Sequence, residues 1–176
     1  ADLHALKIAE GLWPNKTIIN QGNSYLDSMI SQYKSRSHQL SEKQLLVVTE
    51  PISAHARSQY EDEFFFGYTE HDVLKLIFNR IPMISGSNVP EIIRIRPHPS
   101  EEASKYNYIE NSYPQYNIDI SNGSELVDDI ANSNIVIGSN TMALVVAAAL
   151  GKRAISIIPK GALRCVLPQP EIEHWE

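Results

Sequence analysis

The sequence predicts an α/β fold in which a doubly wound parallel sheet carries helices on both faces. Short apolar runs rich in β-branched residues alternate with amphipathic segments, which is the pattern of strand–helix–strand units. Residues 134–158 hold one complete unit: an apolar run, a polar turn, a small apolar helix and a second apolar run. Hydrophobic residues make up 43% of the chain, which supports a sizeable core.

The first 43 residues are predicted to form a helix, a short strand and a second helix, at 2–13, 16–20 and 23–33. Residues 34–43 are polar and have the composition of a linker. We interpret 1–43 as the remainder of a preceding domain and the chain as a fragment, because the sequence starts directly in a helix-like segment.

Residues 44–176 are predicted to form the domain itself. Its strands are expected at 45–48, 91–95, 118–120, 135–137 and 153–158. Its helices are expected to begin at Thr69, at Ser100 and at a capping box of Asn122 and Glu125, and to span 142–150 before Gly151. Residues 52–68 and the tail after Pro159 are predicted to be irregular.

Composition and missing motifs exclude several classes of protein. The net charge is −6 and the basic residues are scattered, so a nucleic-acid partner is not indicated. The single cysteine, Cys165, rules out an internal disulfide and a cysteine-based metal site. No apolar run reaches about 18 residues, so no transmembrane helix is expected. The sequence has no GxGxxG, Walker, GxSxG or HExxH motif, which argues against nicotinamide and P-loop chemistry.

Three polar turns that follow predicted strands supply the candidate site, at 50–53, 96–100 and 138–141. The carboxyl ends of parallel strands share one edge of the sheet, so we expect these turns to converge. Helix N-termini at that edge present free N–H groups, which bind phosphate. The sequence therefore predicts a phosphate-binding site at this edge.

The second turn holds His98 between two prolines, which largely preset the direction of its imidazole. His98 can donate to a phosphate oxygen and, as a cation, balance the charge of a leaving group. The alternative is a turn histidine that is bonded to a neighbouring carbonyl. Pro99 and Ser100 complete this turn as substrate-binding candidates.

The other two turns supply hydroxyl, amide and carboxylate groups. Ser139, Asn140 and Thr141 stand at the start of a helix, where they either bind phosphate or simply cap the helix. Glu50 at a strand end either accepts from ribose hydroxyls, as an acid does in dinucleotide folds, or is a solvated carboxylate. Ser53 is a further binding candidate.

Three segments, RPHPSE at 96–101, IGSNTMAL at 137–144 and AAALGK at 147–152, resemble the C-terminal nucleotide-sugar domain of GT-B glycosyltransferases. The nearest likeness is to bacterial capsule and lipooligosaccharide sialyltransferases and polysialyltransferases, which have an HP motif and a downstream serine motif. Polyol-phosphate transferases and UDP-N-acetylglucosamine 2-epimerases share the general plan. The resemblance covers roughly residues 44–160 and implies a Rossmann-like domain.

This resemblance implies a role for each matching residue. His98 would contact the donor phosphate and assist departure of the leaving group, and Pro99 would hold the turn. Ser139 and Thr141 would bind phosphate, with Asn140 where a second serine is expected. The acidic–acidic–glycine motif that holds the catalytic acid of sialyltransferases is absent from this sequence.

The expected function is the donor-binding half of a glycosyltransferase for bacterial surface polysaccharide or lipooligosaccharide. The expected partners are a nucleotide-sugar donor and a glycan acceptor, with no cofactor and no metal, since helix N-termini and His98 stabilise the leaving charge. The expected location is the cytoplasm, with peripheral association of the full-length protein at the inner face of the membrane. The fragment alone is expected to be inactive, because GT-B enzymes work between two domains. The alternatives are a nucleotide-sugar 2-epimerase and a non-catalytic nucleotide-binding module.

Overall fold

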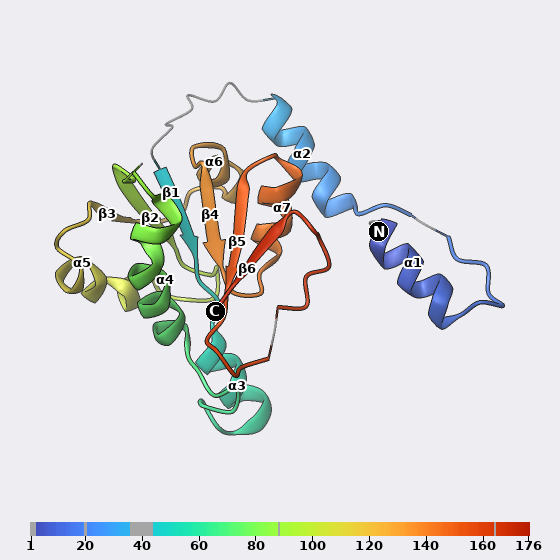
Figure 1. Cartoon of the computed structure of the whole chain (residues 1–176), viewed down its shortest axis with the longest axis horizontal. Helices are drawn as coiled ribbons and strands as arrows, with labels where there is room; N and C mark the ends of the chain where they lie inside the picture. The colour runs from blue at the N-terminus through green and yellow to red at the C-terminus, as the bar shows by residue number, and fades with distance from the viewer. Residues whose placement is uncertain (1–2, 20, 36–43, 88, 164) are drawn as a thin grey trace.

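A computed structural model describes residues 3–19, 21–35, 44–87, 89–163 and 165–176. In this part of the chain six strands form one sheet in the order β3-β2-β1-β4-β5-β6, and all neighbouring strands are parallel (Figure 1). The strands are β1 (Gln44–Val48), β2 (Ile92–Arg96), β3 (Ile118–Ile120), β4 (Ile135–Gly138), β5 (Arg153–Ile157) and β6 (Ile172–Trp175). The predicted doubly wound, Rossmann-like α/β fold is confirmed.

The strand order places β1 between β2 and β4. The chain first winds outward from β1 to β3 and then returns to the other side of β1 to form β4. The direction of winding therefore reverses between β1 and β4. In open parallel sheets this reversal leaves a crevice outside the carboxyl ends of the strands, where ligands bind.

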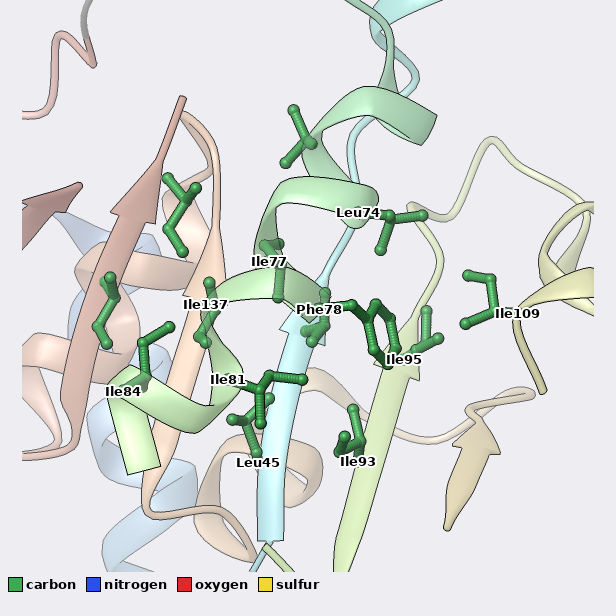
Figure 2. Packing of buried hydrophobic residues seen from close by; sticks show 14 of the residues in the cluster. Leu45, Leu74, Ile77, Phe78, Ile81, Ile84, Ile93, Ile95, Ile109 and Ile137 are labelled. Carbon is green, nitrogen blue, oxygen red and sulfur yellow. The ribbon is translucent and has the colours of Figure 1, made fainter. Parts of the chain in front are cut away.

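Helices cover both faces of the sheet, with α4 on one face and α7 on the other. The described helices are α1 (Leu3–Leu12), α2 (Ser24–Ser35), α3 (Ile52–Tyr60), α4 (Glu70–Ser85), the 3-10 helix η1 (Ala103–Tyr106), α5 (Tyr108–Ser112), α6 (Leu126–Ala131) and α7 (Met142–Ala149). Successive residues of a strand face opposite sides, so Leu45 and Val47 pack under α4 while Leu46 and Val48 pack under α7. Figure 2 shows the α4 side of the core, with Leu74, Ile77, Phe78 and Ile81 above the strands.

The segment before β1 differs in part from its prediction. The helix α2 forms as expected, and its Leu26 and Met29 pack on the α7 side of the core, where α2 contacts α6 and α7. The prediction of a strand at 16–20 is wrong for residues 16–19. These residues form no strand, and Ile19 is 75% exposed. A lone apolar run has no partner strand here to satisfy its backbone groups. Residues 20 and 36–43 lie outside the described residues.

Two segments predicted to be irregular contain regular structure. The first holds α3, which ends at Tyr60 and is capped by Glu61 in the left-handed conformation, with φ 59°. The second holds β6 at the edge of the sheet, where Glu173 forms an ion pair with Arg153 of β5 at 2.6 Å. Neither segment has a long apolar pattern, since α3 buries Ala56 and β6 buries Ile172. Tertiary contacts, and not the local apolar pattern, therefore determine that α3 and β6 form.

The predicted helix starts agree with the structure at Thr69 and differ further along. Thr69 and Asp72 form a capping box at the start of α4. The helix expected from Ser100 begins instead as η1 at Ala103. The box expected from Asn122 and Glu125 does not form, because Glu125 itself is the N-cap and makes no side-chain cap bond.

Gly138 ends β4 where the sheet leaves no room for a side chain. A Cβ at this position would lie 2.9 Å from Cγ2 of Thr141 and 3.2 Å from the carbonyl oxygen of Val48. Because the β1 backbone cannot move away without breaking the sheet, we expect Gly138→Ala to lower the free energy of unfolding by about 1–3 kcal/mol. Chemical denaturation measures this loss. Gly11→Ala is the control, since its added Cβ meets nothing within 4 Å, and an equal loss in both variants would contradict the explanation.

Candidate functional site

Glu50 follows β1 and binds the turn that follows β4. Its Oε2 atom accepts from the Ser139 hydroxyl and, at 2.8 Å, from the backbone N–H of Asn140. Ser139 is buried, and its carbonyl oxygen accepts from the Ser156 hydroxyl of β5 at 2.6 Å. An internal carboxylate therefore occupies the position where a ligand phosphate was expected. The alternative of a merely solvated Glu50 is wrong.

The residues after Ser139 have separate roles. Thr141 caps α7, because its side chain accepts from the N–H of Ala143 at 3.3 Å. The side-chain oxygen of Asn140 accepts from the N–H of Val166 and from the thiol of Cys165, both at 3.2 Å. Asn140 therefore fastens the segment between β5 and β6 to this turn.

His98 lies in a tight turn that is closed by a hydrogen bond of 2.8 Å from the N–H of Glu101 to the His98 carbonyl. The ring atom Nδ1 accepts from the Ser100 N–H at 3.2 Å and lies 2.7 Å from the Ser100 hydroxyl. Pro99 and the imidazole are exposed. The ring is thus bonded to Ser100. The alternative for His98 was a turn histidine bonded to a neighbouring carbonyl, and the ring bonds found among the described residues go to Ser100 instead.

Ser53 is bonded into a cluster of charged side chains beneath the sheet edge. Its backbone N–H and hydroxyl both donate to Glu70, at 2.9 and 2.6 Å. Lys105 forms ion pairs with Glu70 and, at 2.7 Å, with Glu101, and these two carboxylate side chains are only 2% and 4% exposed. Sequence reasoning missed this cluster. The available signal was the i,i+4 spacing of Glu101 and Lys105.

The pKa shifts of Glu70 and Lys105 keep both side chains charged at neutral pH. Burial alone would raise the pKa of Glu70, but hydrogen bonds from Lys105 and Ser53 lower it to about 2. Burial alone would lower the pKa of Lys105, but hydrogen bonds to Glu101 and Glu70 raise it. Burial and the nearby carboxylates raise the pKa of Tyr106, so its phenol stays protonated and donates to Glu101 at 2.8 Å.

A hollow of about 500 Å³ lies beside His98, between the turns that follow β2 and β3. Arg96, the last residue of β2, lines it and is held by Asp129 at 2.5 Å and by the Ser124 carbonyl at 2.8 Å. Asp129 is buried and also pairs with Arg94 at 2.8 Å. The sequence signal for this group was the two arginines in a buried strand, which require acidic partners.

A second hollow of about 400 Å³ lies at the carboxyl ends of β5 and β6, where Ser156, Cys165 and Trp175 line it. Tyr68, in the loop before α4, approaches this region. Burial, then the charges of Glu50 and Cys165, raise the pKa of Tyr68, so its phenol stays protonated at neutral pH. Tyr68 was also missed, because nothing in the local sequence marks a loop tyrosine as part of the edge.

The predicted convergence of the three turns is found in the structure. The His98 and Ser139 turns follow β2 and β4, which flank β1 at the same edge. Since neighbouring strands lie about 4.8 Å apart, the ends of β2 and β4 are separated by roughly 10 Å. The end of β1 lies between them and contacts both turns, through Thr49 and Glu50.

Within the described residues, no group of three or more histidine, cysteine, aspartate or glutamate side chains is arranged to hold a metal ion. None of the described helices combines the length and the apolar character that crossing a bilayer requires.

Comparison with known proteins identifies no family for this chain, because no protein-family model and no curated protein matches it.

The low pKa of Glu70 predicts a loss of stability in acid. A carboxylate whose pKa is lowered on folding stabilises the fold above its unfolded value, here 4.5, and this contribution is lost as the pH falls to about 2. We expect a loss of up to about 3 kcal/mol across this window. In Glu70→Gln the same part of the pH dependence should vanish, as measured by urea denaturation.

The control for this experiment is Glu63→Gln, because Glu63 forms its ion pair with Arg57 at the surface. Surface pairs contribute about 1 kcal/mol or less, so this variant should keep the wild-type slope of stability against pH. A wild-type slope in Glu70→Gln would contradict the assignment.

Proposed function

We propose that this chain is the donor-binding half of a glycosyltransferase that uses a nucleotide-sugar to build bacterial surface polysaccharide or lipooligosaccharide. One observation carries the proposal: the His98 turn and the Ser139 turn flank the end of β1, next to the reversal in strand order. Ligands of parallel α/β sheets bind at such a point. The likeness of 96–101 and 137–144 to GT-B enzymes supports glycosyl transfer as the reaction.

In the proposed reaction the bond between the sugar and the donor phosphate breaks, and the sugar passes to an acceptor hydroxyl. Negative charge then develops on the departing phosphate. His98 would donate a hydrogen bond to that phosphate from its exposed Nε2, because Nδ1 is already bonded to Ser100. A fixed donor aimed at a developing charge is an effective form of catalysis. The acceptor and the base that activates it would come from a second domain.

The hollow beside His98 supports a place for the nucleoside. Its volume of about 500 Å³ is within the usual range for small-molecule sites. Ser104 and Asn122 line it with groups that suit a base or a ribose. A donor lying there would point its phosphate toward His98 and its sugar toward the end of β1.

The two alternative functions gain no support of their own. A 2-epimerase needs carboxylates that face the sugar for proton transfer. Glu50 already accepts from Ser139 and Asn140, and Glu70 and Glu101 are buried. A non-catalytic nucleotide-binding module would share the binding site, so it becomes an outcome of the kinetic test below.

The proposal is tested by measuring thermal shifts of the chain with CMP, UDP, GDP and CDP. Ligand binding raises the melting temperature by mass action, so one of the four should raise it and His98→Ala should reduce that rise. In the complete two-domain enzyme, His98→Ala should lower turnover by about 10²-fold, the scale for losing one preorganised donor. The melting temperature of the variant without ligand should stay near wild type, because His98 is exposed.

Two results would decide against this function. If none of the four nucleotides shifts the melting temperature, donor binding is wrong. If nucleotide binds but His98→Ala turns over at the wild-type rate, the site binds nucleotide without the proposed chemistry.

Glu50→Gln tests which part of the donor meets the α7 turn. The Glu50 carboxylate accepts the hydrogen bonds of the Ser139 hydroxyl and the Asn140 N–H. A phosphate that binds these two donors must therefore displace a negative charge. We expect Glu50→Gln to tighten binding of inorganic phosphate about fivefold, since a charge at a helix N-terminus contributes roughly 1 kcal/mol. Calorimetric titration measures this affinity. Glu110→Gln removes an exposed charge on α5 and should leave the affinity unchanged.

The opposite result has a clear meaning as well. If Glu50→Gln binds phosphate no better but loses affinity for the nucleotide, then Glu50 accepts from donor hydroxyls and the α7 turn does not receive the phosphate.

A further inference from the structure

The carboxylate of Glu101 lies directly beneath the His98 turn and uses both of its oxygen atoms. Oε2 accepts from the Thr49 hydroxyl at 2.9 Å and from the His98 backbone N–H at 3.4 Å. Oε1 accepts from Lys105 at 2.7 Å and from the Tyr106 hydroxyl at 2.8 Å. One nearly inaccessible side chain thereby joins β1, the His98 turn and η1.

The contacts of the imidazole decide which nitrogen carries its proton. The backbone N–H of Ser100 can only donate, and it points at Nδ1 of His98 from 3.2 Å. Nδ1 is therefore an acceptor, and in the neutral ring the proton lies on Nε2. This tautomer depends on the turn, because the Ser100 N–H reaches Nδ1 only while the turn from His98 to Glu101 stays closed.

Stability alone does not require a charged cluster beneath the turn. Two carboxylates, Glu70 and Glu101, share the single cation of Lys105 and are almost inaccessible to water. Removing charges from water costs several kcal/mol per ion, and well-packed apolar residues of similar volume are often as stable or more stable. Such a cluster instead fixes one arrangement of the segments that it joins.

We propose that Glu101 is a positioning residue that holds the His98 turn against the end of β1 and thereby keeps His98 as an Nε2–H donor facing the ligand. The ligand-binding part of this inference rests on the proposed function, whereas the state of the ring can be observed without any ligand. Lys105 supports the arrangement by keeping a positive charge next to Oε1. Thr49 connects the His98 turn and Glu101 to the end of β1, because its hydroxyl accepts from the His98 N–H at 3.3 Å and donates to Glu101.

The experiment compares the whole chain with its Glu101→Gln variant, both labelled with ¹⁵N in histidine. The chemical shifts of Nδ1 and Nε2 of His98 report the tautomer. In the wild type they should be far apart, with the proton on Nε2, and in Glu101→Gln they should converge as the ring samples both tautomers. Affinity for the nucleotide that binds best should fall about tenfold, the scale for weakening one charged hydrogen bond. Glu110→Gln, which removes an equal charge from α5, should match the wild type in both measurements.

Each result has a defined meaning. A single Nε2–H tautomer together with wild-type affinity in Glu101→Gln would overturn the inference. If no nucleotide binds the wild type, the proposed function fails, and the chemical shifts alone still decide whether Glu101 positions the ring. If Glu101→Gln does not fold, Thr49→Val takes its place, since it removes one hydroxyl from the same network and keeps the side-chain shape. Converged shifts in that variant support the inference, and unchanged shifts overturn it.

Discussion

Two consecutive residues at the end of β1, Thr49 and Glu50, hold the turns that follow the two neighbouring strands. Both residues directly follow Val48, the last residue of the strand. Thr49 bonds to Glu101 and the His98 N–H on the β2 side, and Glu50 bonds to Ser139 and the Asn140 N–H on the β4 side. The relative position of the two turns is therefore set by the backbone of one strand. That strand is itself fixed, since Leu45 to Val48 are all buried.

Stability and positioning are supplied by different parts of this molecule. The two apolar clusters on either side of the sheet contain most of the fully buried hydrophobic side chains and supply the main favourable term in the free energy of folding. The charged groups at the carboxyl edge contribute less, because each buried ion loses its hydration. Their bonds are directional, however, and they fix the turns at the sheet edge to elements of the core. Removing one partner leaves the other charge buried without compensation, so a change in the charged groups is expected to alter both the site and the stability of the fold.

The sequence was sufficient to predict the central strands and the edge of the sheet at which the candidate site lies. The runs of β1, β2 and β4 are apolar and β-branched, and parallel strands bring their following turns together whatever the details of the loops. The roles of single polar residues could not be read in the same way. Glu50 and Ser53 were expected to face a ligand, but each is bonded to a residue distant in sequence, Ser139 and Glu70. Glu101 lies where a helix was predicted to begin, but its role depends on Thr49, which lies 52 positions earlier. Local propensity contains no information about such partners.

The bond between Glu50 and the β4 turn bears on how the site could both bind and release an anion. Without a charge facing them, the Ser139 hydroxyl and the Asn140 N–H would need water to satisfy them, and the turn would be less fixed. Glu50 keeps these donors aimed at one point, so a ligand that binds there finds them already oriented. The same carboxylate must give up its bonds when an anion enters, and this competition weakens binding. Under the proposed function such moderate affinity would suit the reaction, because tight binding of the nucleotide product would slow turnover.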